Sequence, residues 1–161
     1  MTGLELPAAA LARLLADVVR FGDNGLETGA VLLSSRRDSH ADVLALCGEH
    51  GIERRPDQFV ISGAALAQLF DWADEAGARV IAQVHSHGGL ARMSPTDRRF
   101  GLTVEGFTSA IVPHFGRPPN DPAAWGWWRF QDQVWVPSDP GSAVAAPSRT
   151  VIFDEEGVRA G

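Results

Sequence analysis

The stretch 79–97, RVIAQVHSHGGLARMSPTD, decides the fold class of this chain. Its first half predicts a strand from Arg79 to His85, and the apolar run Val80-Ile81-Ala82 is typical of a central strand covered on both faces. Its second half predicts a short helix with Ser94 as N-cap and Pro95 at the first helical position. Together with the elements on either side, this arrangement favours a single α/β (α+β) domain around a mixed sheet.

The same stretch carries a candidate metal site. The imidazoles of His85 and His87 are two residues apart on the predicted strand, so they point to the same face, and Asp97 can bring a carboxylate from the next element. Three such ligands leave a fourth position open, which is typical of a metal that activates water. A bare His-x-His pair fits structural or solvent-facing histidines equally well, and Ser94 and Asp97 could be ordinary capping residues.

Other histidine-bearing hydrolase patterns do not fit. A (β/α)₈ barrel needs roughly 200 residues or more, and the chain has 161. The helical His-Glu-x-x-His signature is absent from the sequence. Zinc deaminases need a second cysteine-bearing segment, and Cys47 is the only cysteine.

Composition narrows the function further. A net charge of −6 argues against nucleic-acid binding, which needs clustered cations. One cysteine permits no internal disulfide, so we expect a reducing, cytoplasmic setting, with Cys47 as a buried apolar residue. No apolar run approaches the roughly 20 residues of a membrane span, and residues 7–20 predict an amphipathic helix, not a signal peptide.

Further elements follow from periodicity and turn residues. We expect a second helix over 63–76, capped by Ser62, ended by Gly77 and buried through Leu66, Leu69, Phe70 and Ala73. The predicted strands are 27–34, 42–47, 59–61 and 107–113, followed by a tryptophan-rich hairpin over 125–136. We divide the chain into a domain over 1–136 and, over 137–161, a flexible connector and extension with a strand at 150–153.

The ordered set Glu27-Thr28-Gly29, His85-Ser86-His87 and Ser94-Pro95-Thr96-Asp97 resembles the JAMM (MPN/Mov34, JAB) zinc metalloprotease family, over about residues 27–136. The resemblance implies the cytidine-deaminase-like MPN/JAB fold, with one zinc ion held by His85, His87 and Asp97 and carrying the catalytic water. It also implies that Glu27 is the general base and acid and that Ser94 stabilises the oxyanion. The chain departs from the family pattern at Gly88, where many relatives have proline, and in a spacer one residue shorter, which Gly88-Gly89 could absorb.

By the same resemblance the substrate is a ubiquitin-like protein or its conjugate, bound by its extended C-terminal tail and cleaved after it. We expect no nucleic-acid or membrane partner, and the chain could form a homodimer. Two alternatives stay open: a non-catalytic scaffold that docks partners, and a zinc hydrolase acting on a small amide substrate. Glu27 could instead be a solvated residue at the start of a strand. We interpret Ser86, whose side chain points to the opposite face from the histidines, as a packing residue. We expect surface positions for His40, His50 and His114 and a core or sheet-surface role for the tryptophans.

Overall fold

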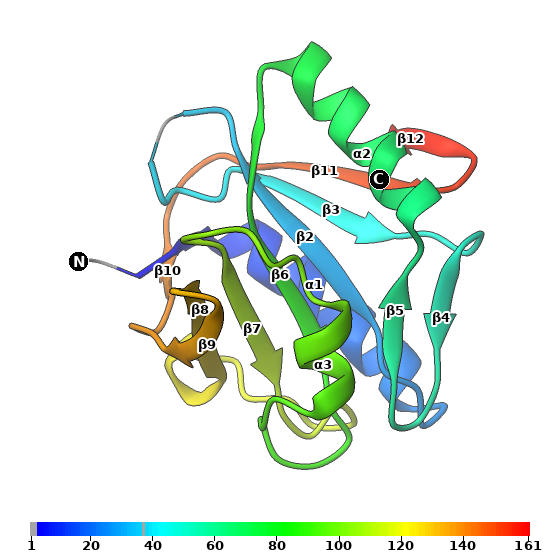
Figure 1. Cartoon of the computed structure of the whole chain (residues 1–161), viewed down its shortest axis with the longest axis vertical. Helices are drawn as coiled ribbons and strands as arrows, with labels where there is room; N and C mark the ends of the chain where they lie inside the picture. The colour runs from blue at the N-terminus through cyan, green and yellow to red at the C-terminus, as the bar shows by residue number, and fades with distance from the viewer. Residues whose placement is uncertain (1–2, 37) are drawn as a thin grey trace.

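The central strand predicted at Arg79–His85 is present as β6, inside a mixed sheet (Figure 1). The computed structural model describes residues 3–36 and 38–161, and within them the main sheet has eight strands in the order β12-β11-β3-β2-β6-β7-β8-β9. Their bounds are β2 Gly29–Ser34, β3 Val43–Cys47, β6 Arg79–Ser86, β7 Thr108–Val112, β8 Gly126–Gln131, β9 Val134–Pro137, β11 Arg149–Asp154 and β12 Gly157–Ala160. The mixed α/β fold class is therefore confirmed.

Two helices, α1 (Ala8–Gly22) and α2 (Gly63–Ala76), cover opposite faces of this sheet. Side chains alternate between the faces along each strand, so Leu32 packs with α1 while its neighbour Val31 packs with α2. Every residue of β2, β3 and β7 is buried, as expected for strands between two helical layers.

The second helix has the predicted ends. The Ser62 hydroxyl accepts a hydrogen bond from the Ala65 backbone N–H at 3.1 Å, and Gly77 ends the helix with φ of 69°. Its buried face is narrower than predicted, because Leu69 is buried while Phe70 is 39% exposed. Apolar spacing alone did not show which part of the helix the sheet would cover.

Two pairs of short strands lie beside the main sheet. Residues 59–61 form β5 (Phe59–Ile61), which pairs in antiparallel fashion with β4 (Ile52–Arg54), a segment without a predicted strand. At the N-terminus, β1 (Glu5–Pro7) pairs in parallel with β10 (Ser142–Val144). Strand β10 lies in the segment that we predicted to be a flexible connector. The prediction of irregular structure there was wrong for these three residues, because their partner strand lies at the far end of the chain.

The N-terminal strand also changes the setting of His40. We predicted a surface histidine, but His40 is buried and its Nδ1 lies 3.4 Å from a carboxylate oxygen of Glu5. Burial follows from the bridge between Glu5 and His40 in this part of the fold. His50 and His114 are exposed, as predicted.

The C-terminal segment belongs to the sheet. The predicted strand at 150–153 is β11, which runs parallel to β3 and antiparallel to β12. The tryptophan-rich hairpin is formed by β8 and β9, and its turn residues Asp132 and Gln133 both have positive φ, as a tight hairpin of this kind requires. Trp125 and Trp127 stack with centroids 5.9 Å apart and are buried, which confirms their core role.

The remaining helical segments are α3 (Pro95–Phe100) and the 3₁₀ turn η1 (Pro122–Ala124). None of the helices in the described ranges combines the length and apolar composition needed to cross a bilayer.

Candidate metal centre

Strand β6 ends at the candidate metal centre, and the parallel strand β7 beside it holds this end in place. The side chains of His85 and His87 converge with the carboxylate of Asp97 from α3. The two Nε2 atoms are 3.1 Å apart, and they lie 3.0 Å and 3.1 Å from Oδ1 and Oδ2 of Asp97, respectively. All three side chains are largely shielded from solvent, with exposed fractions of 3%, 13% and 5%. The structure thus brings together the three predicted ligands.

The start of α3 fixes the direction of the Asp97 side chain. The Ser94 hydroxyl accepts a hydrogen bond from the Asp97 backbone N–H at 3.1 Å, and Asp97 Oδ2 accepts one from the Ser94 N–H at 2.8 Å. This reciprocal capping box holds the carboxylate against the first turn of the helix. The same pair of hydrogen bonds therefore caps α3 and directs the Asp97 carboxylate toward the two histidines.

The spacing of the three groups fits a divalent ion such as zinc. Zinc bonds of about 2.0–2.1 Å in a tetrahedron separate neighbouring ligand atoms by about 3.3 Å, close to the 3.0–3.1 Å seen here. The His87 Nδ1 lies 3.2 Å from the Leu90 carbonyl oxygen, which directs Nε2 toward the shared point. His85 Nδ1 is buried with no hydrogen-bond partner in the described part of the chain, so its ring is held by packing.

That packing comes from Phe59 on β5. Its ring stacks on His85 with centroids 6.2 Å apart and an angle of 15° between planes. A Cβ atom at Gly29 would lie 2.6 Å from the Phe59 ring, so glycine at this position allows the ring to approach β2. The hairpin of β4 and β5 is thereby part of the wall of the site.

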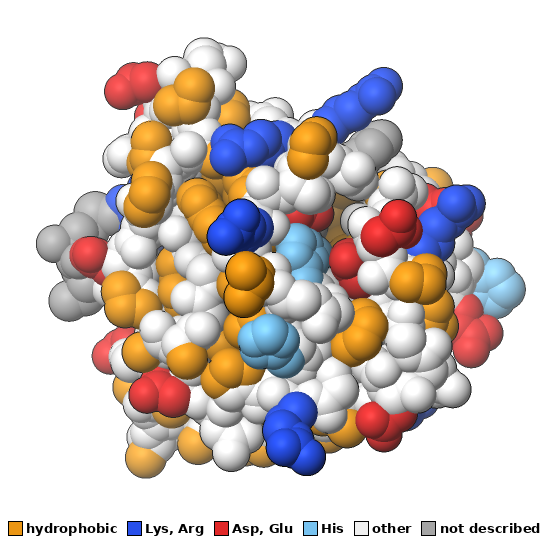
Figure 2. Space-filling view, turned by 90° about the horizontal axis from the view of Figure 1, so that it is seen from below, with side chains coloured by type: hydrophobic (Ala, Val, Ile, Leu, Met, Phe, Trp, Pro, Cys, Tyr) orange, Lys and Arg blue, Asp and Glu red, His pale blue; other side chains and the backbone are white. Residues whose placement is uncertain are grey.

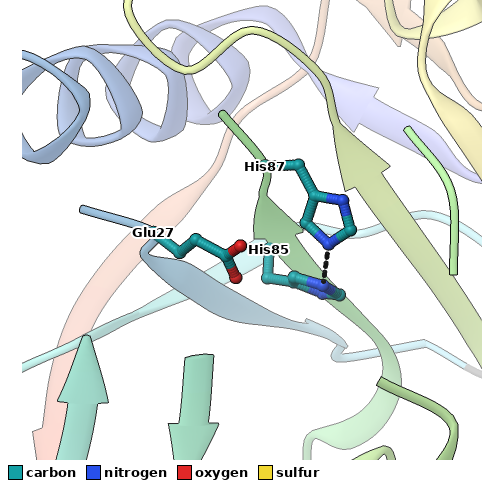
Figure 3. Close-up of side chains that lie close together, drawn as sticks. All are labelled: Glu27, His85 and His87. Atoms are coloured by element: carbon teal, nitrogen blue, oxygen red, sulfur yellow. Dashed lines mark hydrogen bonds between the residues drawn. The ribbon is translucent and has the colours of Figure 1, made fainter. Parts of the chain in front are cut away.

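Glu27 lies just before β2 and faces the same point. Its carboxylate points toward the two imidazoles (Figure 3), and the ligand atoms of Glu27, His85 and His87 lie within 4.8 Å of one another. Glu27 is 4% exposed, yet its Oε1 has no hydrogen-bond partner within residues 3–36 and 38–161. The alternative of a solvated strand start does not describe this residue.

The electrostatic effects on the two carboxylates are opposite. Burial raises the pKa of Glu27 to about 7, with His87 lowering it and Asp97 adding to the rise. Burial alone would also raise the pKa of Asp97, but its hydrogen bonds with His85 and His87 hold it far below the usual value. Burial works to lower the pKa of His87, but Asp97, Glu27 and the Leu90 carbonyl together outweigh burial and raise that pKa. Asp97 is thus held as an anion, whereas Glu27 can change its protonation near neutral pH.

Seen from the end of the molecule at which β6 terminates, histidine side chains lie near the middle of the surface, with arginine and acidic side chains beside them (Figure 2). Gly88 and Gly89 lie in the loop that follows His87. Neither Gly88 nor Gly89 has a positive φ, so the loop does not use the left-handed conformations that glycine permits. Instead, a Cβ at Gly88 would lie 2.9 Å from the Phe115 ring, so this glycine serves close packing.

Three residues that support the site were not identified as such from the sequence. Ser86, between the two histidines, hydrogen-bonds to the backbone of Thr28, and the Thr28 hydroxyl accepts a hydrogen bond from Arg54. Local patterns could not indicate these contacts, since Thr28 lies 58 residues from Ser86 and 26 from Arg54.

No family model matches the sequence. A curated relative, named "Probable metalloprotease y4jG", from Sinorhizobium fredii is 28% identical over 122 residues, covering 73% of this chain and 75% of the relative. The solution structure of protein DSY2949 from Desulfitobacterium hafniense has a similar fold, with 14% identity, a TM-score of 0.69 and coverage of 89% and 94% of the two chains. The crystal structure of AF2198, a JAB1/MPN domain protein from Archaeoglobus fulgidus, has 16% identity and a TM-score of 0.48, with 89% of this chain and 99% of that chain covered.

The motif residues occur in the order of the JAMM pattern, and their side chains meet at one point. The site therefore has the arrangement that the JAMM resemblance implies. The residues that carry this resemblance come from three places: the segment before β2, the end of β6 with the residue after it, and the first turn of α3.

Proposed function

We propose that this chain is a zinc-dependent peptidase or isopeptidase that hydrolyses the amide bond after the C-terminal tail of a ubiquitin-like protein. The observation that carries the proposal is the convergence of His85, His87 and Asp97 at 3.0–3.1 Å, with the buried Glu27 carboxylate directed at the same point. The name of the Sinorhizobium fredii relative supports the broader class of metalloprotease. The ubiquitin-like substrate and the cytoplasmic location, which the single buried cysteine favours, are part of the proposal.

His85, His87 and Asp97 would hold the zinc ion. When bound, zinc supplies a Lewis acid that polarises the scissile carbonyl and lowers the pKa of a coordinated water from about 15.7 to about 7. The ligand residues also exclude solvent, since their side chains are at most 13% exposed.

Glu27 would transfer the proton. Burial raises the pKa of Glu27 to about 7 in the chain without metal, so this carboxylate is more basic than an exposed glutamate. Oε1 can therefore accept a proton from the attacking water and later donate it to the departing amine. General acid and base catalysis of this kind is worth about 10²–10⁴-fold in rate.

Ser94 would stabilise the developing negative charge on the substrate carbonyl oxygen. Its oxygen accepts the Asp97 N–H, and that bond does not use the hydroxyl hydrogen. A donor of this kind contributes about 10²-fold or more to the rate. The capping box keeps this hydroxyl at the same helix end as Asp97.

The substrate tail would bind in an extended form beside β5. This strand pairs with β4 among the described residues and lies between β4 and the end of β6 in Figure 1. The Phe59 contact with His85 places β5 next to the metal centre. An extended tail that adds to the other edge of β5 would reach the site with backbone hydrogen bonds providing affinity.

Turnover of a tail-fused ubiquitin-like protein tests the function. Incubation with zinc-loaded protein should release the intact ubiquitin-like protein with a free C-terminal carboxylate, as measured by mass spectrometry. A chelator should abolish release and added zinc should restore it. Absence of cleavage across fused and amine-linked substrates would contradict the proposed function, and release of a single amino acid would indicate the small-substrate alternative.

A further inference from the structure

We propose that Arg54 and Thr28 are positioning residues for Glu27: they hold the backbone beside Glu27 so that its carboxylate faces the metal centre. This inference rests on the proposed function, in which Glu27 transfers the proton. Within residues 3–36 and 38–161, the side chains of Arg54 and Thr28 form no hydrogen bond with His85, His87 or Asp97.

Glu27 needs an indirect support of this kind. Its Oε1 is buried without a hydrogen-bond partner among the described residues, so no contact to that atom fixes the direction of the carboxylate. Its backbone is held instead, since the Glu27 N–H donates to the Arg55 carbonyl oxygen at 2.9 Å. The direction of the side chain therefore depends on how firmly the two neighbouring peptide units are held.

Thr28 holds the other side of Glu27 with both its backbone and its side chain. Its N–H donates to the Ser86 hydroxyl at 2.9 Å, and its carbonyl oxygen accepts the Ser86 backbone N–H at 2.8 Å. Its hydroxyl accepts a hydrogen bond from Arg54 Nε, also at 2.9 Å. Thr28 is fully buried, so water does not compete for these bonds. Ser86 lies between the two histidines, and the distance from Glu27 to the metal ligands is set through this residue.

Arg54 connects Thr28 to the end of β3. Its two terminal nitrogens donate to the carbonyl oxygens of Cys47 and Gly48, each at 2.8 Å, at the end of β3. Its guanidinium carbon lies 4.0 Å from the centre of the Phe21 ring at the end of α1. A planar guanidinium can make all these contacts at once, whereas a lysine ammonium cannot reproduce their geometry. Arg54 thus connects α1, β3 and the residue next to Glu27.

Thr28→Val and Thr28→Ser are the variants that test this role, because valine keeps the branched shape and serine keeps the hydroxyl. We expect Thr28→Val to lower kcat about 10- to 100-fold, since displacement of a reacting group by about 1 Å has effects of this size. KM and zinc affinity should stay within about twofold, because substrate and metal contacts are made elsewhere. Thr28→Ser should retain most of the wild-type kcat, because serine keeps the hydroxyl.

Arg54→Lys should follow Thr28→Val in direction, with kcat reduced and zinc affinity retained. Arg20→Met is the matched control, because the Arg20 guanidinium lies 4.6 Å from the same Phe21 ring but hydrogen-bonds to Asp17 instead of Thr28. Its kinetics should equal those of the wild type. Thermal melting and circular dichroism should show that each variant is folded.

Hydrogen exchange separates this inference from the proposed function. In zinc-loaded Thr28→Val, amides in the segment 26–30 should exchange at least about tenfold faster, while β6 stays protected. Unchanged exchange there, unchanged kcat in Thr28→Val, or an equal loss of zinc affinity would overturn the positioning role. If the wild type cleaves no tail substrate, the proposed function fails, and the exchange rates of 26–30 still decide whether Thr28 holds this segment.

Discussion

Glu27 and Asp154 are both buried carboxylates at strand ends, but they differ in their hydrogen bonds and in the direction of their pKa shifts. Asp154, at the end of β11, is 1% exposed and accepts hydrogen bonds from Arg159 and from the backbone N–H groups of Glu49 and Glu156. Burial alone would raise its pKa, but these bonds outweigh burial and hold the pKa at about 2. Glu27 is similarly buried, has an oxygen without a partner, and has a pKa raised to about 7.

The difference separates a structural carboxylate from one available for chemistry. A fully hydrogen-bonded carboxylate stabilises the folded chain and keeps its charge, so it cannot exchange protons near neutral pH. A buried carboxylate without such partners costs stability, and such groups are retained at functional sites. The contrast therefore predicts opposite effects when each residue is changed to its neutral amide.

Changing Glu27 to glutamine should have the largest effect on activity. We expect hydrolysis of a tail-fused substrate to fall by about 10²–10⁴-fold, because the amide cannot accept or return the proton. Asp154→Asn, the matched change at the structural carboxylate, should retain activity at a temperature where it is folded. Single-turnover rates with zinc-loaded proteins measure both effects, and equal losses in the two variants would remove the distinction.

The same Glu27→Gln change should stabilise the chelator-treated protein above neutral pH. An acid with a raised pKa in the folded state gives stability that is present at low pH and is lost as pH rises from about 4.5 to about 7. The free energy of unfolding of Glu27→Gln should exceed that of the wild type by up to about 3 kcal/mol at pH 8. The difference should disappear near pH 4, as measured by urea unfolding. A wild type that is more stable than the variant at pH 8 would contradict the claim that the buried charge of Glu27 lowers the free energy of unfolding.

Asp154→Asn should destabilise the chain, with the opposite dependence on pH. Because the pKa of Asp154 is lowered, its contribution is present above about pH 4 and is lost as pH falls toward 2. We expect a loss of about 2 kcal/mol in unfolding free energy at pH 7 and almost none at pH 2. A loss that is the same at both values would mean that the Arg159 and backbone bonds do not act through the charge.

Cys47 sharpens the comparison as a third buried ionisable group. Burial raises the pKa of its thiol to about 12, and the residue is 5% exposed at the end of β3. Unlike Glu27, it does not face the metal centre, so burial alone does not make a group functional. We expect no alkylation by iodoacetamide at pH 8 in the folded protein and full alkylation in urea. Rapid labelling of the folded form would show that β3 is less well covered than the structure indicates.

The part of the site that the sequence revealed is the part built from neighbouring residues. His85, His87 and Asp97 lie within one strand, loop and helix, and the Ser94-Pro95 capping pattern fixed the start of that helix. Glu27 could be assigned only through the JAMM resemblance, because a single acidic residue before a strand has many roles. The structure places it at the site.

The supporting contacts and the ends of the sheet depended on pairing between distant segments. Arg54 reaches Thr28 because β4 and β5 fold back as a hairpin, and turn residues at 51–56 suggested only a loop. In the same way, the pairing of β1 with β10 buries His40. Local sequence patterns predict the secondary structure of each segment, but these contacts depend on which distant segments pair in the folded chain.

Zinc content of three variants tests the central claim most directly, because two carboxylates, Glu27 and Asp97, lie near the same pair of imidazoles. Elemental analysis after dialysis against limiting zinc should give about one zinc per chain for the wild type and for Glu27→Gln. Asp97→Asn and His87→Ala should contain almost none. Loss of zinc from Glu27→Gln together with its retention in Asp97→Asn would contradict the account, since Glu27 would then be a ligand instead of the proton carrier.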